Sequence, residues 1–260
     1  MAKTKRNILK NILKKSSIVC LTAYTAPMAK LIDEFADIIL VGDSLGPVLY
    51  GFKSTREVNL DMMIQHAKSV VKNTRKSFVV VDMPFGSYQK SKYDALRNAR
   101  KIISETGAMA VKIEGGKKFA KTIDFLIQNK IKVMGHLGLL PQSLRGKPKV
   151  YGKTLIERNQ LLEDIYYLKE AGIFSLVIEC TTKSLVDEAV QKFDLPIIGI
   201  GASEKCRGQI IVTEDILGMT NFKSKFLKKY LNFFPFAKKA LRKFSDDVKK
   251  GKYPNRKQCY

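Results

Sequence analysis

The chain has 260 residues, of which 45% are hydrophobic and 27% charged, and its formal net charge is +23. This length suits one (β/α)8 barrel or one large doubly wound domain, with a core large enough to need no disulfides. No apolar stretch approaches the roughly 18 residues of a membrane helix, and the basic start lacks the apolar segment of a secretory signal. The four cysteines are widely spaced without a CxxC pair, so we expect reduced thiols and a cytoplasmic protein.

The excess positive charge belongs to the two ends of the chain. Residues 1–15 hold six basic residues and no acid, and residues 223–260 hold thirteen basic and two acidic residues. The body between them has 28 basic and 22 acidic residues. A nucleic-acid-binding protein would interleave basic and aromatic residues on one surface, and no RNA-binding motif is present. We interpret the ends as solvated lysine-rich surface and expect no specific nucleic acid partner.

Short apolar runs alternate with amphipathic stretches from residue 17 to residue 215. The runs, which we expect to be buried parallel strands, lie at 17–23, 38–42, 78–82, 109–113, 132–136, 175–179, 196–200 and 210–213. The amphipathic stretches, which we expect to be helices, lie at 26–36, 59–74, 92–106, 117–129, 155–171 and 184–193. Eight strands with interleaved helices predict an α/β fold, a (β/α)8 TIM-type barrel.

The pattern departs from a regular barrel near its end. The seventh and eighth strands are joined by GASEKCRGQ without a helix, and a further helical region at 223–250 is interrupted at Pro235. We interpret residues 1–260 as a single barrel domain with a basic N-terminal segment, 1–15, and a helical C-terminal extension, 223–260. The connections after the second and fifth strands are longer than the others. In a barrel such loops build the active face.

Four acidic residues each close an apolar run: Asp43, Asp82, Glu114 and Glu179. Each acid singly could cap a helix or lie at the surface, but four at the carboxyl ends of parallel strands would face one another. Asp43, Asp82 and Glu114 follow successive strands and offer the oxygen ligands that magnesium prefers. No Cys/His cluster suggests zinc. The sequence therefore predicts a magnesium site that is open to a substrate.

Three further side chains point to the same end of the barrel. Lys112 lies two residues before Glu114, on the same face of its strand. It could neutralise the metal site, bind the carboxylate of a substrate, or form a purely structural ion pair. Glu179 ends the sixth strand, across the barrel from the other acids, where a general base would face a metal-bound substrate. His136, on the fifth strand, is either a core residue or a substrate contact.

Taken together, seven stretches resemble the ketopantoate hydroxymethyltransferases, also called 3-methyl-2-oxobutanoate hydroxymethyltransferases, of pantothenate biosynthesis. They are LTAY at 21–24, LVGDSLGPVLYG at 40–51, VVVDMPFGSY at 79–88, AVKIEGG at 110–116, GHLGLLPQS at 135–143, LVIEC at 176–180 and IGIGAS at 198–203. The combination is specific because VGDSLG, DMPFGSY and VKIEGG occur in order at sensible spacing.

The resemblance implies a magnesium-dependent transfer of a hydroxymethyl group from 5,10-methylenetetrahydrofolate to 3-methyl-2-oxobutanoate, giving 2-dehydropantoate through a Mg-stabilised enolate. It assigns the metal to Asp43 and Asp82, with Glu114 in or next to its shell. It assigns the oxo acid to Asp43, Ser44, Asp82 and Lys112, and the role of proton acceptor to Glu179. It also implies a homo-oligomer, commonly a decamer.

The chain departs from the usual family pattern at three positions. Thr25 stands where LTAYD is usual, Ser203 where GIGAG is usual, and Arg207 where an acidic residue usually precedes GQ. We expect these positions to lie around the rim and in the seventh-strand loop and to leave the metal chemistry intact, whereas the details of folate recognition stay open. The alternative enzyme is a related Mg-dependent 2-oxo acid C–C lyase or mutase of the isocitrate lyase type. Members of that group do not share the VGDSLG and DMPFGSY motifs.

Overall fold

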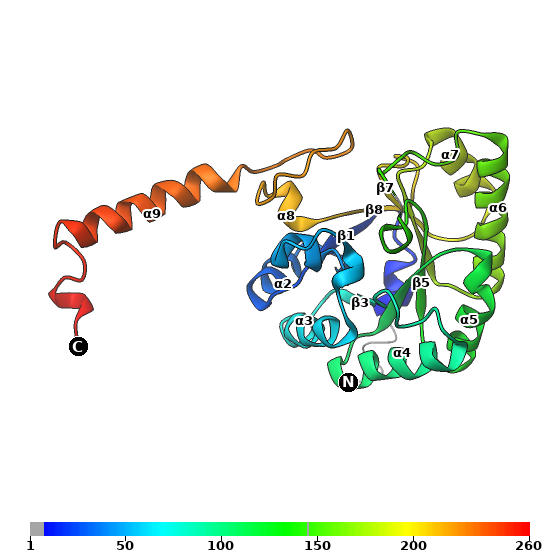
Figure 1. Ribbon diagram of the computed structural model, residues 1–260, viewed down its shortest axis with the longest axis horizontal. Coiled ribbons are helices and arrows are strands. Elements are labelled where there is room, and N and C mark those ends of the chain that lie inside the picture. The colour runs from blue at the N-terminus through cyan, green and yellow to red at the C-terminus, as the bar shows by residue number, and fades with distance from the viewer. Residues whose placement is uncertain (1–7, 145) are drawn as a thin grey trace. The chain divides into compact units, whose positions relative to one another are not determined.

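The computed structural model describes residues 8–144 and 146–260. Eight parallel strands form a closed barrel in which each strand pairs with its neighbours in the sequence and β8 pairs with β1 (Figure 1). The strands are β1 (Ile18–Thr22), β2 (Ile38–Val41), β3 (Phe78–Asp82), β4 (Ala110–Glu114), β5 (Val133–Gly138), β6 (Ser175–Glu179), β7 (Ile197–Ile200) and β8 (Gly208–Ile211). The TIM-type barrel predicted from the sequence is confirmed.

Helices follow most of the strands and lie around the outside of the barrel (Figure 1). They are α2 (Ala26–Ile32), α3 (Leu60–Lys72), α4 (Lys92–Thr106), α5 (Lys117–Gln128), α6 (Leu155–Glu170) and α7 (Lys183–Lys192). Asn59, Ser91 and Thr154 cap three of them, each accepting a hydrogen bond from a backbone N–H of the first turn. Short 3₁₀ or π turns lie in the loops at η1 (Gly46–Tyr50), η2 (Thr55–Glu57) and η3 (Pro141–Ser143).

Alternate residues of each strand belong to two separate apolar clusters, because successive side chains of a strand point to opposite faces. Ile39, Val79 and Val111 pack with the helices in the outer cluster. The inner cluster fills the barrel and includes Leu40 and Val80. Residues 8–12 are helical, and two of their side chains are buried in this inner cluster beside the amino ends of the strands. These are Leu9 and Ile12.

The predicted strands and barrel helices are all present, with no end shifted by more than four residues. The absence of a helix between β7 and β8 is also confirmed, since residues 201–207 contain only turns and bends. The prediction for 223–250 was wrong in detail. Pro235 does not interrupt a helix but lies in the first turn of α9 (Phe233–Lys249), where its missing N–H costs no helical hydrogen bond.

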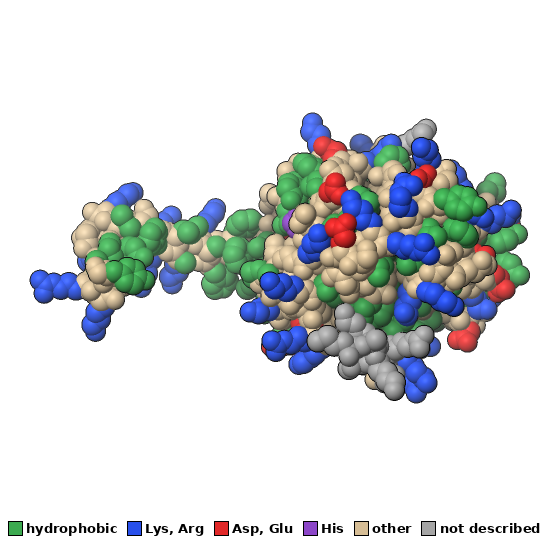
Figure 2. Space-filling view, turned by 90° about the horizontal axis from the view of Figure 1, so that it is seen from below, with side chains coloured by type: hydrophobic (Ala, Val, Ile, Leu, Met, Phe, Trp, Pro, Cys, Tyr) green, Lys and Arg blue, Asp and Glu red, His purple; other side chains and the backbone are tan. Residues whose placement is uncertain are grey.

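The chain divides into two compact units, Met1–Val212 and Thr213–Tyr260. The second unit contains α8 (Thr213–Ile216), α9 and a final turn, η4 (Arg256–Gln258). Figure 2 shows Lys and Arg side chains scattered over one face of the barrel unit, with acids among them, instead of a single basic patch. Within the described part of the chain, no helix is both long and apolar enough to span a membrane. A single domain with an extension at 223–260 stays a prediction.

Candidate active site

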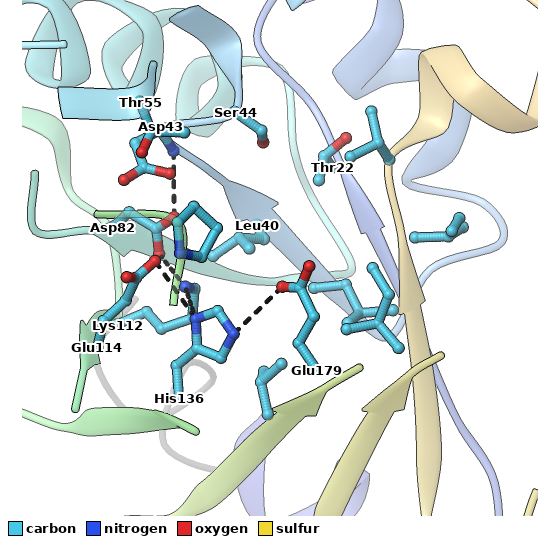
Figure 3. A pocket seen from close by; sticks show the side chains of 16 residues that line it. Thr22, Leu40, Asp43, Ser44, Thr55, Asp82, Lys112, Glu114, His136 and Glu179 are labelled. Atoms are coloured by element: carbon cyan, nitrogen blue, oxygen red, sulfur yellow. Dashed lines mark hydrogen bonds and ion pairs between the residues drawn. The ribbon is translucent and has the colours of Figure 1, made fainter. Parts of the chain in front are cut away.

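A cavity of about 130 Å³ lies inside the barrel, at the carboxyl ends of the strands. Asp82, Glu114 and Glu179 are the last residues of β3, β4 and β6, and Asp43 follows β2. All seven residues that the sequence analysis selected line this one cavity (Figure 3). They are Asp43, Ser44, Asp82, Lys112, Glu114, His136 and Glu179.

Asp43 and Asp82 lie side by side on one wall of the cavity (Figure 3). The backbone N–H of Asp43 donates to Asp82 Oδ2 at 3.1 Å. The other carboxylate oxygen of Asp82, Oδ1, lies 3.1 Å from Lys112 Nζ, an ion pair whose two side chains are about 95% buried. Asp82 Oδ1 has no aligned hydrogen-bond donor. A buried oxygen of this kind is available to a ligand.

His136 connects the two sides of the cavity. Its Nδ1 lies 3.1 Å from Lys112 Nζ and 3.5 Å from Glu114 Oε1, and its Nε2 lies 3.3 Å from Glu179 Oε2. In the neutral ring Nδ1 accepts from the lysine, because an ammonium group only donates, and in the protonated ring Nδ1–H faces Glu114. In both states Nε2 carries a proton and faces Glu179.

Glu179 lies opposite the two aspartates and is less buried than they are (Figure 3). The backbone around it is tightly constrained. Cys180, the next residue, has φ +47°, a left-handed backbone conformation that is unfavourable for residues other than glycine. On the neighbouring strand, a Cβ at Gly138 would lie 2.1 Å from the carbonyl oxygen of Glu179, so only glycine fits there. This close packing fixes the height at which Glu179 enters the cavity.

Two residues that the sequence analysis did not select form hydrogen bonds to the acid-bearing segments from behind the cavity lining. Gln142, in η3, donates through its side-chain amide to Asp43 Oδ2 at 2.8 Å and through its backbone to Glu114 Oε2 at 3.0 Å. Tyr88 donates to Gln142 Oε1 at 2.8 Å. Both lie inside the stretches that resemble the family, but an amide in a loop has no spacing signal that would mark it.

Hydroxyl groups and apolar side chains form the rest of the lining. The Ser44 hydroxyl is hydrogen bonded to Tyr24 at 2.8 Å. The Thr55 hydroxyl, which the sequence analysis did not select, is buried beside Asp43 without a hydrogen-bond partner (Figure 3). The lining also contains the apolar side chains of Leu40, Val177, Ile200 and Ile210, and Ile200 lies beside Glu179 in the sheet. The cavity therefore combines charged and apolar groups.

The buried charges shift one another's proton affinity. Burial and the neighbouring carboxylates of Asp82 and Glu114 raise the pKa of Asp43 well above its ordinary value, and burial also raises the pKa of Asp82. Burial opposes ionisation of Glu114, but His136 and Lys112 outweigh it and lower the pKa. Burial would lower the pKa of Lys112 and of His136, yet the surrounding carboxylates raise both.

These observations fit a hard divalent cation. Asp43 and Asp82 present adjacent buried carboxylates, and burial together with a neighbouring carboxylate raises the pKa of each, a shift that a bound cation would oppose. No three His, Cys, Asp or Glu side chains of the described residues form a ready-made cage. Magnesium does not need one, since it commonly uses one or two carboxylates together with water and substrate oxygens.

None of the three departures from the family pattern lines the cavity. Ser203 is buried and its hydroxyl donates to Asp187 of α7. Arg207 donates to the carbonyl oxygen of Leu13, at the amino end of the barrel. Arg207 therefore does not lie at the rim of the cavity as expected but at the opposite end of the strands. Thr25 is exposed where α2 begins, at the carboxyl end of β1.

The barrel resembles solved structures of several enzymes. Phosphonopyruvate hydrolase, solved as a complex with oxalate and Mg++, matches with a TM-score of 0.63 at 12% identity, over 98% of this chain and 93% of that one. 2,3-Dimethylmalate lyase, a PEP mutase/isocitrate lyase superfamily member, matches with a TM-score of 0.63 at 14% identity, over 96% and 87%. At such identity the likeness concerns the fold. By class, the protein is a (β/α)8 barrel with an acid-lined cavity.

Sequence relatives give the family. The ketopantoate hydroxymethyltransferase model matches residues 2–256. The chain is 49% identical over 257 residues to 3-methyl-2-oxobutanoate hydroxymethyltransferase of Pelagibacter ubique (strain HTCC1062), covering 98% of this chain and 99% of that one. It is 47% identical over 258 residues to the enzyme of that name from Anaplasma marginale (strain St. Maries), covering 98% and 93%. The chain belongs to the ketopantoate hydroxymethyltransferase family, transferases of pantothenate biosynthesis.

Proposed function

We propose that the protein transfers a hydroxymethyl group in this cavity from 5,10-methylenetetrahydrofolate to 3-methyl-2-oxobutanoate. The products are 2-dehydropantoate and tetrahydrofolate. The observation that carries this proposal is the placement of Glu179 across the cavity from Asp43 and Asp82. A small oxo acid held by the aspartate side would present its C3 to the Glu179 carboxylate. The volume of about 130 Å³ suits such an acid and is below that of pockets for drug-sized ligands.

Asp43 and Asp82 would hold Mg²⁺, and Glu114 would lie next to its shell. When bound there, Mg²⁺ would draw negative charge toward the keto oxygen and make the neighbouring C3–H more acidic. Lys112 supports the same site by a different route. Its buried ammonium offsets part of the charge of Asp82 and Glu114, and it can also face the carboxylate of the oxo acid.

Apolar groups of the lining would bind the branched end of the substrate. Val177, Ile200 and Ile210 line the cavity, and Ile200 lies beside Glu179 in the sheet, so an isopropyl group would leave water there. Ser44 would contact the oxo acid beside Asp43. The substrate would thus be oriented by its polar end at the aspartates and its branched end near Glu179.

Glu179 would act as the general base. Its carboxylate takes the proton from C3, and the electron pair left on carbon forms the new bond to the methylene carbon of the folate donor while one of the two C–N bonds of that carbon breaks and its nitrogen takes up a proton. Water then displaces the second folate nitrogen from that carbon and gives it a proton, which leaves the hydroxymethyl group on the oxo acid and frees tetrahydrofolate. His136 Nε2 lies 3.3 Å from Glu179 Oε2 and would donate to it once the two groups align, leaving the other oxygen for the substrate.

Product formation tests the proposal directly. The protein is incubated with Mg²⁺, 3-methyl-2-oxobutanoate and 5,10-methylenetetrahydrofolate, and 2-dehydropantoate is measured by mass spectrometry with and without EDTA. We expect product that depends on both the folate and the metal. Product of the same yield in excess EDTA would overturn the metal assignment, and no product under any condition would overturn the reaction.

The proposal extends to assembly. We expect a homo-oligomer, a decamer by family resemblance, acting in the cytoplasm. Within the C-terminal unit, α9 exposes Phe234, Phe236, Leu241 and Phe244, which offer apolar surface to another copy. Light scattering coupled to size-exclusion chromatography would measure the mass, and a monomer at micromolar concentration would contradict this expectation.

A further inference from the structure

Gln142 is a loop residue with an unusual degree of burial. It lies in η3, in the long connection after β5, where side chains are commonly exposed to solvent. Yet only 1% of Gln142 is accessible, and its neighbour Ser143 is exposed. A buried amide is costly unless its donors and acceptor are satisfied, so its contacts explain why the loop turns inward here.

Those contacts reach the carboxyl ends of three other strands, β2, β3 and β4. The Gln142 side-chain amide donates to Asp43 Oδ2 at 2.8 Å and to the Met83 carbonyl oxygen at 3.0 Å. The side-chain oxygen Oε1 of Gln142 accepts from the Tyr88 hydroxyl at 2.8 Å, and the backbone N–H of Gln142 donates to Glu114 Oε2 at 3.0 Å. Only an amide side chain supplies two donors and an acceptor without a charge.

The lack of charge matters for Asp43. A lysine at this place would neutralise the carboxylate, whereas the Gln142 amide fixes Oδ2 and leaves the negative charge in place. The other oxygen of Asp43 remains for a cation. Neighbouring groups that orient a metal ligand in this way set its rotamer and its basicity.

Glu114 is restrained through one of its oxygens. Its Oε2 accepts from the Gln142 backbone N–H at 3.0 Å. Its Oε1 lies 3.5 Å from His136 Nδ1, which donates to it only when the ring is protonated. Gln142 thus contacts Asp43 through its side chain and Glu114 through its backbone.

We propose that Gln142 is a positioning residue that presents Asp43 to the divalent cation through one oxygen and holds Glu114 as a neighbouring acceptor. The inference rests on the proposed function, because it assumes a cation at Asp43 and Asp82. It adds a residue of the fifth loop to a site whose acids come from β2, β3 and β4.

The test is the affinity for Mn²⁺, used as the probe without substrate and followed by the electron paramagnetic resonance of the free ion. Gln142→Met keeps the length of the side chain and removes both donors. We expect its Mn²⁺ affinity to fall about 10- to 100-fold, the usual effect of losing a group that orients a metal ligand. Gln128→Met, on the exposed face of α5, is the matched control and should bind Mn²⁺ like the wild-type protein.

A merely structural role would lower the melting temperature of Gln142→Met and leave the Mn²⁺ affinity of the folded protein unchanged at low temperature, which would overturn the proposal. If Gln142→Met does not fold, Tyr88→Phe removes only the hydroxyl that fixes the amide. We expect a smaller loss of Mn²⁺ affinity, and wild-type affinity would overturn the proposal. Absence of Mn²⁺ binding by the wild-type protein would instead count against the proposed metal site.

Discussion

The two ends of the barrel are built from the same eight strands but from different kinds of residue. On β3 the inward side chains run from Phe78 through Val80 to Asp82, so the strand changes from apolar to charged along its length. At the amino end Leu9 and Ile12 fill the remaining space with apolar groups. At the carboxyl end, buried charges and a cavity take their place.

Aspartates at the two ends show what this difference does. Asp33 precedes β2 at the amino end and accepts hydrogen bonds from the backbone N–H groups of Arg75, Lys76 and Ser77. Burial alone would raise its pKa, but these bonds outweigh burial and lower the pKa of Asp33. For Asp43, at the other end, burial and other carboxylates raise the pKa. One end satisfies its charges internally and serves stability, whereas the other keeps charge available for a ligand.

The largest expected effect comes from removing the base. Glu179→Gln keeps the shape of the side chain but cannot accept a proton, so the exchange of the C3 hydrogen of 3-methyl-2-oxobutanoate in D2O should slow by about 10²- to 10⁴-fold. Nuclear magnetic resonance follows the exchange. Glu163→Gln, on α6, is the control. Exchange at the wild-type rate in Glu179→Gln would exclude the residue as the base.

The second largest effect is expected from removing the buried ammonium group of Lys112. Lys112→Met leaves Asp82 and Glu114 without their ammonium partner, and breaking a buried pair typically costs about 3–5 kcal/mol of unfolding free energy. Urea denaturation in EDTA measures this loss, and added Mg²⁺ should restore part of it. Lys121→Met, exposed on α5, should change little. A loss below about 1 kcal/mol would show that Lys112 does not balance these charges.

A substitution at the amino end of the barrel should change stability and leave the chemistry of the cavity unchanged. Leu9→Ala removes a buried side chain from the inner cluster, and we expect the free energy of unfolding to fall by about 2–3 kcal/mol. Below the melting temperature, C3–H exchange should stay at the wild-type rate. Leu155→Ala, on the exposed start of α6, is the control for stability. Slower exchange in the folded Leu9→Ala protein would contradict the separation of the two ends.

The smallest effect is a dependence on pH. Because the pKa of Asp33 is lowered in the folded state, its stabilising contribution is present above the ordinary pKa of about 3.9 and is lost as pH falls through the lowered value. Asp33→Asn should therefore cost about 1 kcal/mol at neutral pH. Its difference from wild type should shrink on acidification. Asp61→Asn, exposed on α3, is the comparison, and a difference that grows in acid would refute this assignment.

Strand order and the acids were predictable because each follows a local rule. A run such as FVVV before Asp82 marks a buried strand, and parallel strands bring their carboxyl ends together. Gln142 and Thr55 could not be found in this way, since their positions depend on how two long loops fold over the barrel. The place of Arg207 was also missed, because a connection without a helix crosses from one end of the barrel to the other within seven residues.

The loop that carries Gln142 returns to the strand that carries Glu179. Tyr151 N–H donates to the Cys180 carbonyl oxygen at 2.8 Å, and Thr182 N–H donates to the Tyr151 carbonyl oxygen at 2.9 Å. Both ends of the loop are thus anchored, while residues 147–150 between them are exposed. A fluorescent label placed at 148–149 would lie in this exposed part of the loop. It would report ligand entry without replacing any group that lines the cavity.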